Sequence, residues 1–214
     1  MVYTLEKLTI KPLISLWLRK VEGIGNIPKG IPFILAPNHS SYLDVFLAPS
    51  IVLSSIGRKM HALGNYYYWK NSFTSFFLDW WECIPVYVEH EKNAKEKNML
   101  ALEKALSYLK QGHIFIIFPE GRRSDGKLIK GHTGIARLAL MAKVPVLPCG
   151  IINANNVLPK GKLFPRFARC EVKIGKLMYF DKYYNKKPSK KILEEITRSI
   201  MKEIAKLIGQ KYNY

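Results

Sequence analysis

Residues 113–124 read HIFIIFPEGRRS, a short apolar run that Pro119 ends and that continues into a charged turn. An apolar run of this length, bounded by turn residues, is typical of a buried strand. Further candidate strands are 32–36, 58–63, 83–88, 144–149 and 170–175. Longer amphipathic stretches between or after them predict helices at 42–55, 66–79, 91–111, 132–143 and 190–210, the last with Ser189 as its N-cap. This alternation predicts a single α/β domain with a largely parallel sheet flanked by helices.

The length of 214 residues and the apolar content of 48% suit one domain with a substantial core. We expect that domain at residues 26–214, preceded by an amphipathic helix within residues 1–25. Residues 5–20 alternate apolar side chains with lysine and arginine, which fits a helix that lies on a membrane or one that packs on the domain. No signal peptide is recognisable, and no run of about 18 apolar residues predicts a membrane span.

The charge balance is strongly basic, with 34 Lys and Arg against 16 Asp and Glu. Residues 157–191 alone hold eleven basic and two acidic side chains. Such an excess fits nucleic acid, phosphorylated metabolites or an anionic membrane as partner, and equally a solubilising surface. Cys83, Cys149 and Cys170 lie far apart in apolar stretches, which predicts buried thiols rather than metal ligands or disulfides.

Residues 38–44 read NHSSYLD and follow the candidate strand at 32–36. On a regular helix His39 and Asp44 would lie about 140° apart, so they can meet only if His39 lies in the preceding loop. With Ser41 as the N-cap, Asp44 at the third helical position could hold one imidazole nitrogen and leave the other as a general base. The alternative is a capped helix beside a loop histidine without catalytic function, and the spacing alone favours that alternative.

The turn after the 113–118 run carries the groups that bind phosphate. Gly121 permits backbone conformations that other residues resist. The guanidinium groups of Arg122 and Arg123 and the hydroxyl of Ser124 are donors suited to a phosphate. Glu120 could orient an arginine or hold a substrate hydroxyl. An ordinary exposed turn is the alternative. Both charged segments follow candidate strands, and ligands of α/β folds bind beyond the carboxyl ends of strands.

The ordered set N-H-x4-D, F-P-E-G-x-R-S and V-P-V-L-P resembles the glycerolipid acyltransferase family, typified by 1-acylglycerol-3-phosphate O-acyltransferase, over about residues 31–151. The resemblance implies that His39 removes a proton from the acceptor hydroxyl and that Asp44 orients and stabilises it. The hydroxyl then attacks the thioester of acyl-CoA or acyl carrier protein directly. We expect no metal and no cofactor besides this acyl donor.

The resemblance also assigns substrate contacts and a location. Glu120, Gly121 and Arg123 match family residues that bind the glycerol phosphate. We add Asn38, Ser124 and Lys130 to the expected substrate-binding residues. Pro145 matches a motif that helps to shape the acyl-binding region. The family is similar in having an α/β core on the cytoplasmic face of a membrane. We therefore expect a peripheral or monotopic protein on an anionic phospholipid membrane, with a lysophospholipid as substrate and no nucleic acid as partner.

Two positions that usually carry a cation in this family are vacant, one within 62–65 and one within 84–90. The candidates to replace them are Arg58, Lys59, Lys70 and Lys130. Acyl transfer is therefore better supported than a lysophosphatidic acid acceptor, and another lysolipid or hydroxylated lipid is the second interpretation. A third is a non-catalytic basic protein that binds membranes or nucleic acid, although a pure binder does not need a histidine–carboxylate pair.

Nine of the sixteen residues in 66–81 are aromatic. Phe73, Phe76, Phe77 and Trp80 fall at helical spacing and would line one face of a helix. That face could pack in the core, or it could form an interfacial belt or an acyl-chain groove. We assign Phe73, Phe76 and Phe77 to the acyl region.

Overall fold

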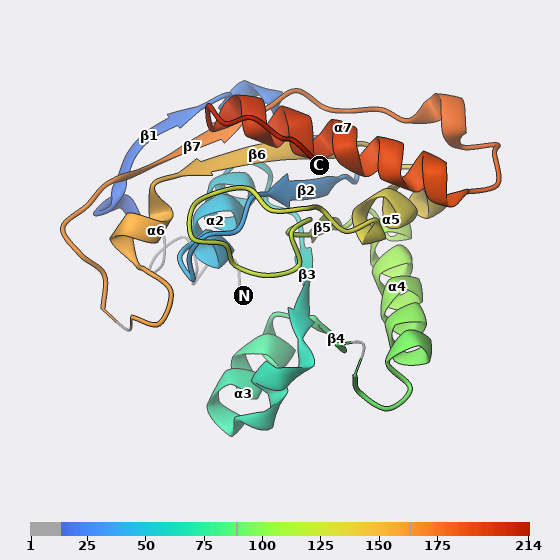
Figure 1. Ribbon diagram of the computed structural model, residues 1–214, viewed down its shortest axis with the longest axis horizontal. Coiled ribbons are helices and arrows are strands. Elements are labelled where there is room, and N and C mark those ends of the chain that lie inside the picture. The colour runs from blue at the N-terminus through green and yellow to red at the C-terminus, as the bar shows by residue number, and fades with distance from the viewer. Residues whose placement is uncertain (1–13, 89, 163) are drawn as a thin grey trace.

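The computed structural model describes residues 14–88, 90–162 and 164–214, which form one seven-stranded sheet with helices on both faces (Figure 1). The strands are β1 Leu18–Glu22, β2 Ile34–Pro37, β3 Met60–Asn65, β4 Ile84–Val86, β5 Ile114–Ile116, β6 Val146–Ile152 and β7 Cys170–Ile174. The helices are α2 Asp44–Ile56, α3 Ser72–Trp80, α4 Ala94–Lys110, α5 Gly134–Ala142, α6 Ala154–Val157 and α7 Lys190–Leu207. The short 3-10 helices are η1 Ile24–Asn26, η2 Tyr66–Lys70 and η3 Asp181–Tyr183.

The sheet has the strand order β1-β7-β6-β2-β5-β3-β4. Every neighbouring pair is parallel except β6 and β7, which are antiparallel. The expected α/β domain with a largely parallel sheet is confirmed. All six strands expected from the sequence are present within a few residues of their expected bounds.

The two central strands separate two apolar cores. Ile34 and Phe115 pack on the face covered by α4, α5 and α7, whereas Leu35 and Ile116 pack on the face covered by α2. Side chains alternate between the two faces of a strand, so both faces of these strands are apolar. Continuous apolar runs such as FILA and IFII are therefore what a central parallel strand requires.

The structure corrects the expected helix within residues 1–25. Residues 18–22 form strand β1, which pairs in parallel with β7 at the edge of the sheet. Arg19 and Glu171 form an ion pair across this strand pair, with a distance of 3.2 Å between Nε and Oε1. Strand pairing with a partner about 150 residues away overrides the local helical pattern here. The earlier part of the expected helix, residues 1–13, lies outside the described residues.

Four expected helices begin two to six residues later than predicted, and for two of them the caps differ as well. The expected helix at 66–79 is two elements, because Asn71 caps α3 through its side chain, which accepts hydrogen bonds from the N–H groups of Phe73 and Thr74. Helix α2 begins at Asp44, so Ser41 is not its N-cap. The N-cap expected at Ser189 is confirmed, since its hydroxyl accepts a hydrogen bond from the N–H of Ile192 in α7.

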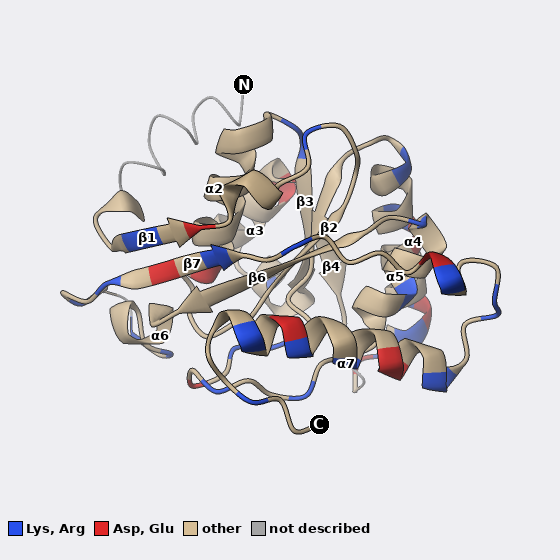
Figure 2. Ribbon diagram, turned by 90° about the horizontal axis from the view of Figure 1, so that it is seen from above, with Lys and Arg blue, Asp and Glu red and all other residues tan. Residues whose placement is uncertain are grey.

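The charged side chains are distributed differently over two segments of the surface. Figure 2 shows basic and acidic residues interspersed along α7, while the loop from α6 to β7 carries basic residues and no acidic one. Among the described residues, no helix has both the length and the apolar character needed to cross a bilayer.

Candidate active site

The two charged segments meet at the carboxyl edge of the sheet. Strands β2 and β5 are parallel neighbours, so the loops that follow them leave the sheet side by side. The backbone N–H of His39 donates to Oε1 of Glu120 at 3.2 Å, and the N–H of Ser124 donates to the carbonyl of His39 at 2.8 Å. Residues more than 80 positions apart thus form one structural unit, as the sequence analysis expected.

The carboxylate of Asp44 holds the imidazole of His39. The distance from Nδ1 of His39 to Oδ2 of Asp44 is 3.1 Å, and Asp44 is fully buried. The same oxygen accepts from the N–H groups of Ser40 at 2.6 Å and Ser41 at 2.7 Å. A carboxylate accepts hydrogen bonds, so Nδ1 carries the hydrogen and Nε2 is left with a lone pair for a substrate proton.

The loop around His39 is fixed on all sides. The ring of Phe118 stacks on the imidazole with a centroid distance of 4.1 Å. The side chain of Asn38 donates to the carbonyl of Ile151 at 2.9 Å and accepts from its N–H at 2.7 Å. Both amide atoms of Asn38 are used in this way and the residue is buried, so it positions the loop against β6. The expected contact of Asn38 with the substrate stays a prediction.

Glu120 and Ser124 are also buried, which assigns them to the support of the site rather than its surface. Burial, reinforced by the charge of Asp44, raises the pKa of Glu120 to about 7, although hydrogen bonds from His39 and Ser124 act in the opposite direction. Its contact with the N–H of His39 orients the loop that carries this histidine. Direct contact of these two buried side chains with substrate stays a prediction.

Arg123, one of the expected phosphate ligands, stacks on an aromatic ring. Its guanidinium carbon lies 3.5 Å from the centroid of the Tyr42 ring, a stacked geometry. The hydroxyl of Tyr42 lies 3.4 Å from that of Tyr68. Burial raises the pKa of Tyr68, and the nearby Arg123 opposes that rise. Tyr42 and Tyr68 were not expected as site residues, although Tyr42 lies within the NHSSYLD segment.

Gly121 permits a close approach of two segments of the turn. Its φ is +66°, and a Cβ built on it would lie 2.9 Å from Cδ2 of His132. The N–H of His132 also donates to the carbonyl of Pro119 at 2.8 Å. The glycine therefore serves both the left-handed backbone and the packing of His132 on the turn. Nothing in the sequence pattern indicated His132.

All four cations considered as replacements for the vacant positions can now be placed. Arg58 and Lys59 precede β3, at the edge of the sheet opposite His39, and they interact there with the carbonyl of Gly112 and with Glu82. Lys70 follows β3 on the side of the site, with its ammonium 5.9 Å from the centroid of the Tyr67 ring. Arg58 and Lys59 are therefore too far from His39 to replace the missing cations of the site. Lys130 is exposed on the loop that begins with the Glu120 turn.

Pro145 does not lie beside the reacting groups. It precedes β6, and its carbonyl accepts a hydrogen bond from the N–H of Ile34 at the start of β2. His39 follows the other end of β2, five residues further along, which corresponds to roughly 15 Å of extended chain. The structure gives Pro145 a structural contact at the opposite edge of the sheet, and its expected role in the acyl region stays a prediction.

The aromatic side chains of α3 are exposed, so this face of the helix does not pack in the core. The exposed fractions are 73% for Phe73, 65% for Phe76, 42% for Phe77 and 41% for Trp80. The rings of Phe76 and Phe77 pack edge to face with centroids 5.5 Å apart. In Figure 1, α3 extends beyond the end of the sheet below β3 and β4. The face is thus an apolar surface next to η2, whose Tyr68 contacts Tyr42.

No group of three or more His, Cys, Asp or Glu side chains within residues 14–88, 90–162 and 164–214 could hold a metal ion. The three cysteines are free, and Cys149 and Cys170 are buried as expected. Burial raises the pKa of Cys170 to about 11, so its thiol is protonated at neutral pH.

The fold and these contacts define a class of protein, an α/β enzyme with a histidine–carboxylate pair at the carboxyl edge of its sheet. A sequence model described as "Acyltransferase" matches residues 19–152, more than half of the chain. The chain belongs to this acyltransferase family.

Individual relatives agree with the family. The 1-acyl-sn-glycerol-3-phosphate acyltransferase of Bacillus subtilis is 27% identical over 146 residues, covering 67% of this chain and 69% of the relative. The enzyme of that name from Borreliella burgdorferi is 28% identical over 159 residues, covering 71% of this chain and 59% of the relative. The crystal structure of the 1-acyl-sn-glycerophosphate (LPA) acyltransferase PlsC from Thermotoga maritima superposes with a TM-score of 0.72. It is 24% identical and covers all of this chain and 82% of that one, which establishes the fold.

Proposed function

We propose that this acyltransferase moves a fatty acyl group from acyl-CoA or acyl carrier protein to the free hydroxyl of 1-acyl-sn-glycerol 3-phosphate, forming phosphatidic acid. The observation that carries the proposal is the contact of 3.1 Å between Nδ1 of His39 and the buried Oδ2 of Asp44. The printed names of the relatives support the choice of acceptor.

The chemistry follows from the free ring nitrogen. Nε2 of His39 takes the proton of the acceptor hydroxyl while its oxygen attacks the thioester carbonyl carbon. The resulting tetrahedral intermediate collapses, the carbon–sulfur bond breaks, and the new ester is formed. The thiolate that leaves takes the proton back from the imidazolium, which restores His39. Asp44 stabilises the imidazolium between these steps through its negative charge.

The phosphate of the acceptor is assigned to Arg123. The guanidinium is held by stacking on Tyr42, and a planar guanidinium binds a phosphate through two parallel hydrogen bonds. The turn that carries it is tied to His39 by the Ser124 contacts, so phosphate and hydroxyl are positioned by one rigid unit. Lys130 on the same loop supplies a second cation.

A different lysolipid or hydroxylated lipid is the second candidate acceptor. The ring of Trp69 lies over Gly64, with 3.0 Å between Cζ3 and a Cβ built on that glycine. An aromatic ring therefore occupies the end of β3, where related proteins usually carry a cation. Without a cation at this position, the site has less positive charge for a headgroup, which favours an acceptor with less negative charge.

We also propose that the enzyme works as a peripheral or monotopic protein on the cytoplasmic face of a membrane, because its acceptor is a lipid. The exposed aromatic face of α3 supports this, since Phe and Trp side chains favour the boundary between headgroups and acyl chains. The contact between Tyr68 and Tyr42 places this face close to the candidate site.

Incubation of the purified protein with radiolabelled acyl-CoA, or with acyl carrier protein loaded with the same acyl group, tests the proposal. The acceptors are lysophosphatidic acid and lysolipids with glycerol, choline or ethanolamine headgroups, and the products are identified by mass spectrometry. Labelled phosphatidic acid as the main product supports the first acceptor. A different main product supports the second candidate, and the absence of any acylated product contradicts both.

A further inference from the structure

The loop between α6 and β7 combines basic residues with exposed aromatic side chains. Residues 158–169 contain four basic residues and no acidic one. Phe164 is 83% exposed and Phe167 is fully exposed, although large apolar side chains are usually buried. Arg166 and Arg169 are exposed beside them. Exposed aromatic rings among cations are the combination that favours the headgroup layer of an anionic bilayer.

Hydrogen bonds hold this loop at its base and at its end before β7. The N–H of Arg166 donates to the carbonyl of Val157 at 2.7 Å, which closes the loop at its base. The side chain of Asn153 donates to the carbonyl of Arg169 at 2.6 Å, just before β7 begins. The hydrogen bond to Val157 closes the part of the loop that carries Phe164, and Phe167 lies between the two anchored residues Arg166 and Arg169.

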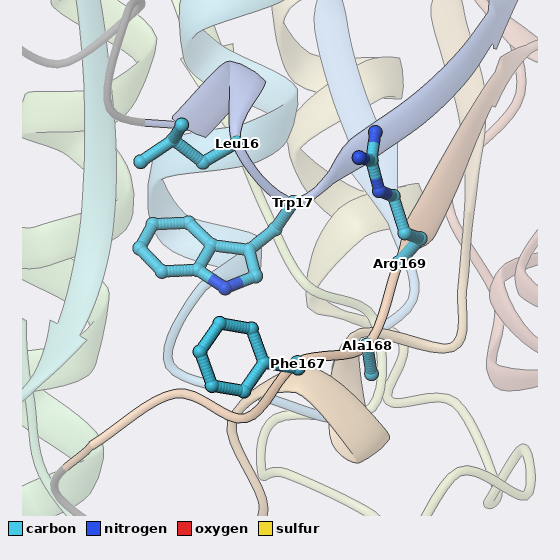
Figure 3. Close-up of a pocket in the computed structure, with 5 residues that line it drawn as sticks. All are labelled: Leu16, Trp17, Phe167, Ala168 and Arg169. Carbon is cyan, nitrogen blue, oxygen red and sulfur yellow. The ribbon is translucent and has the colours of Figure 1, made fainter.

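A cleft of about 420 Å³ lies beside this loop. Its lining residues are Leu16, Trp17, Phe167, Ala168 and Arg169. Figure 3 shows the indole of Trp17 and the ring of Phe167 facing the same space, with Arg169 to one side. An apolar groove with a guanidinium at its margin is complementary to an acyl chain that ends in an anionic headgroup.

The loop is joined to the catalytic segment. The hydroxyl of Ser41 donates to the carbonyl of Leu158 at 2.8 Å, where the loop begins. Ser41 in turn is one of the two N–H donors to Asp44. On the other side, Tyr42 contacts Tyr68 next to the exposed face of α3. The histidine segment thus lies between two exposed aromatic surfaces.

We propose that the α6–β7 loop docks on an anionic phospholipid bilayer, with Phe164 and Phe167 inserted at the headgroup boundary and one acyl chain of a membrane lipid in the Trp17–Phe167 cleft. The four cations of the loop neutralise the anionic headgroups around it. A single-stranded nucleic acid would also suit cations and aromatic rings, but the apolar cleft favours lipid. The proposal rests on the proposed function in one respect, because a lipid acceptor brings the enzyme to a membrane.

Vesicle flotation tests the proposal with the full chain and two double variants. The first is Phe164→Ser with Phe167→Ser. The matched control is Met99→Ser with Leu100→Ser on α4, whose side chains are 56% and 60% exposed. The vesicles are phosphatidylcholine with or without phosphatidylglycerol. We expect the loop variant to bind the anionic vesicles at least about tenfold more weakly than wild type, because two aromatic side chains no longer insert. The control should bind within about twofold of wild type.

A second measurement addresses the cleft directly. Phospholipids with brominated acyl chains should quench Trp17, so wild type should lose more fluorescence than the Trp17→Phe variant. Equal loop-variant and control affinities would overturn the docking proposal, as would quenching that does not depend on Trp17. Thermal melting of all variants separates loss of binding from loss of the fold. Tight binding of a single-stranded oligonucleotide that only the loop variant loses would also count against lipid as the partner.

The vesicle-binding and quenching measurements do not require the enzyme to transfer an acyl group. Turnover of wild type is measured separately with a short-chain lysophosphatidic acid that is soluble without vesicles. Normal turnover together with equal vesicle binding of the two double variants would contradict the docking proposal but not the proposed function. Loop-dependent binding to anionic vesicles without any acyl transfer would contradict the proposed function but not the docking proposal.

Discussion

Nδ1 of His39 lies 3.1 Å from Oδ2 of Asp44, and that oxygen also accepts the backbone N–H groups of Ser40 and Ser41. Three donors converge on one buried oxygen, so the carboxylate cannot rotate without losing all of them. A fixed carboxylate fixes the tautomer and the orientation of the ring. The two imidazole nitrogens therefore have different tasks, and this difference can be tested by mutation.

We expect His39→Ala to abolish acyl transfer and Asp44→Asn to lower kcat by about two to four orders of magnitude. The amide introduced by the second substitution can present a donor where the imidazole needs an acceptor, which favours the wrong tautomer. Steady-state kinetics with thermal melting as a folding control provide the measurement. Turnover that persists unchanged in His39→Ala would exclude this histidine as the base.

Arg123 and its neighbour Arg122 form a natural pair of variants. Arg122 is exposed, whereas the guanidinium of Arg123 stacks on Tyr42 beside the site. Arg123→Ala should raise the KM for the acceptor by about tenfold to a hundredfold, the effect of losing a charge-assisted contact to phosphate. Arg122→Ala should change that KM by less than about threefold. Equal effects of the two substitutions would show that stacking on Tyr42 does not select the phosphate ligand.

A histidine cluster away from the site predicts how stability depends on pH. Burial lowers the pKa of His61 to about 4, with His113 and Lys59 adding to the decrease and Glu82 opposing it. Nε2 of His61 lies 2.9 Å from Nδ1 of His113, and the ring of Tyr108 stacks on His61. The folded state thus resists a proton that the unfolded chain accepts near pH 6.5.

Above pH 6.5 His61 is neutral in both states and has no linked effect on stability. Between pH 6.5 and 4 only the unfolded chain takes the proton, so the free energy of unfolding should fall by up to about 3 kcal/mol from this residue. Denaturant titrations of wild type and His61→Gln across this range measure the effect, since contributions common to both proteins cancel. A difference between the two proteins that stays constant from pH 4 to 6.5 would contradict the assignment.

The sequence predicted the parts of this protein that depend on local pattern. Apolar runs indicated the central strands, because a strand buried on both faces cannot alternate with polar residues. The positions of His39 and Glu120 directly after such strands predicted that they would meet, since the carboxyl ends of parallel strands share one edge of the sheet. The capping residue Ser189 was also recognisable from its local context.

The features that sequence could not predict depend on distant partners. Strand β1 forms because β7 offers an edge, and no local pattern contains that information. Asn38 resembles a ligand beside His39, yet its partner is the backbone of Ile151, 113 residues further on. The spacing of the α3 aromatics predicted a shared face but not whether another element covers it. Pro145 lies in a recognised motif that the sheet carries to the far edge.

Gly121 tests how strongly the turn depends on one close contact. Gly121→Ala adds a methyl group where a Cβ would lie 2.9 Å from Cδ2 of His132, at a backbone φ of +66°. Gly57→Ala is the matched control, because its φ is +61° and no atom lies within 4 Å of a Cβ built there. We expect Gly57→Ala to cost about 1 kcal/mol of stability, from the left-handed backbone alone.

The same substitution at Gly121 should cost more than the control, by about 1 kcal/mol, and should also lower kcat/KM by at least about tenfold. The reason is that the turn must shift to relieve the contact, and the turn carries Arg123 and supports the backbone of His39. Adding His132→Ala to Gly121→Ala removes the contact but leaves the backbone strain, so it should recover the extra stability cost. Equal stability and kinetics in the Gly121 and Gly57 variants would mean that packing of His132 on the turn does not control the position of Arg123.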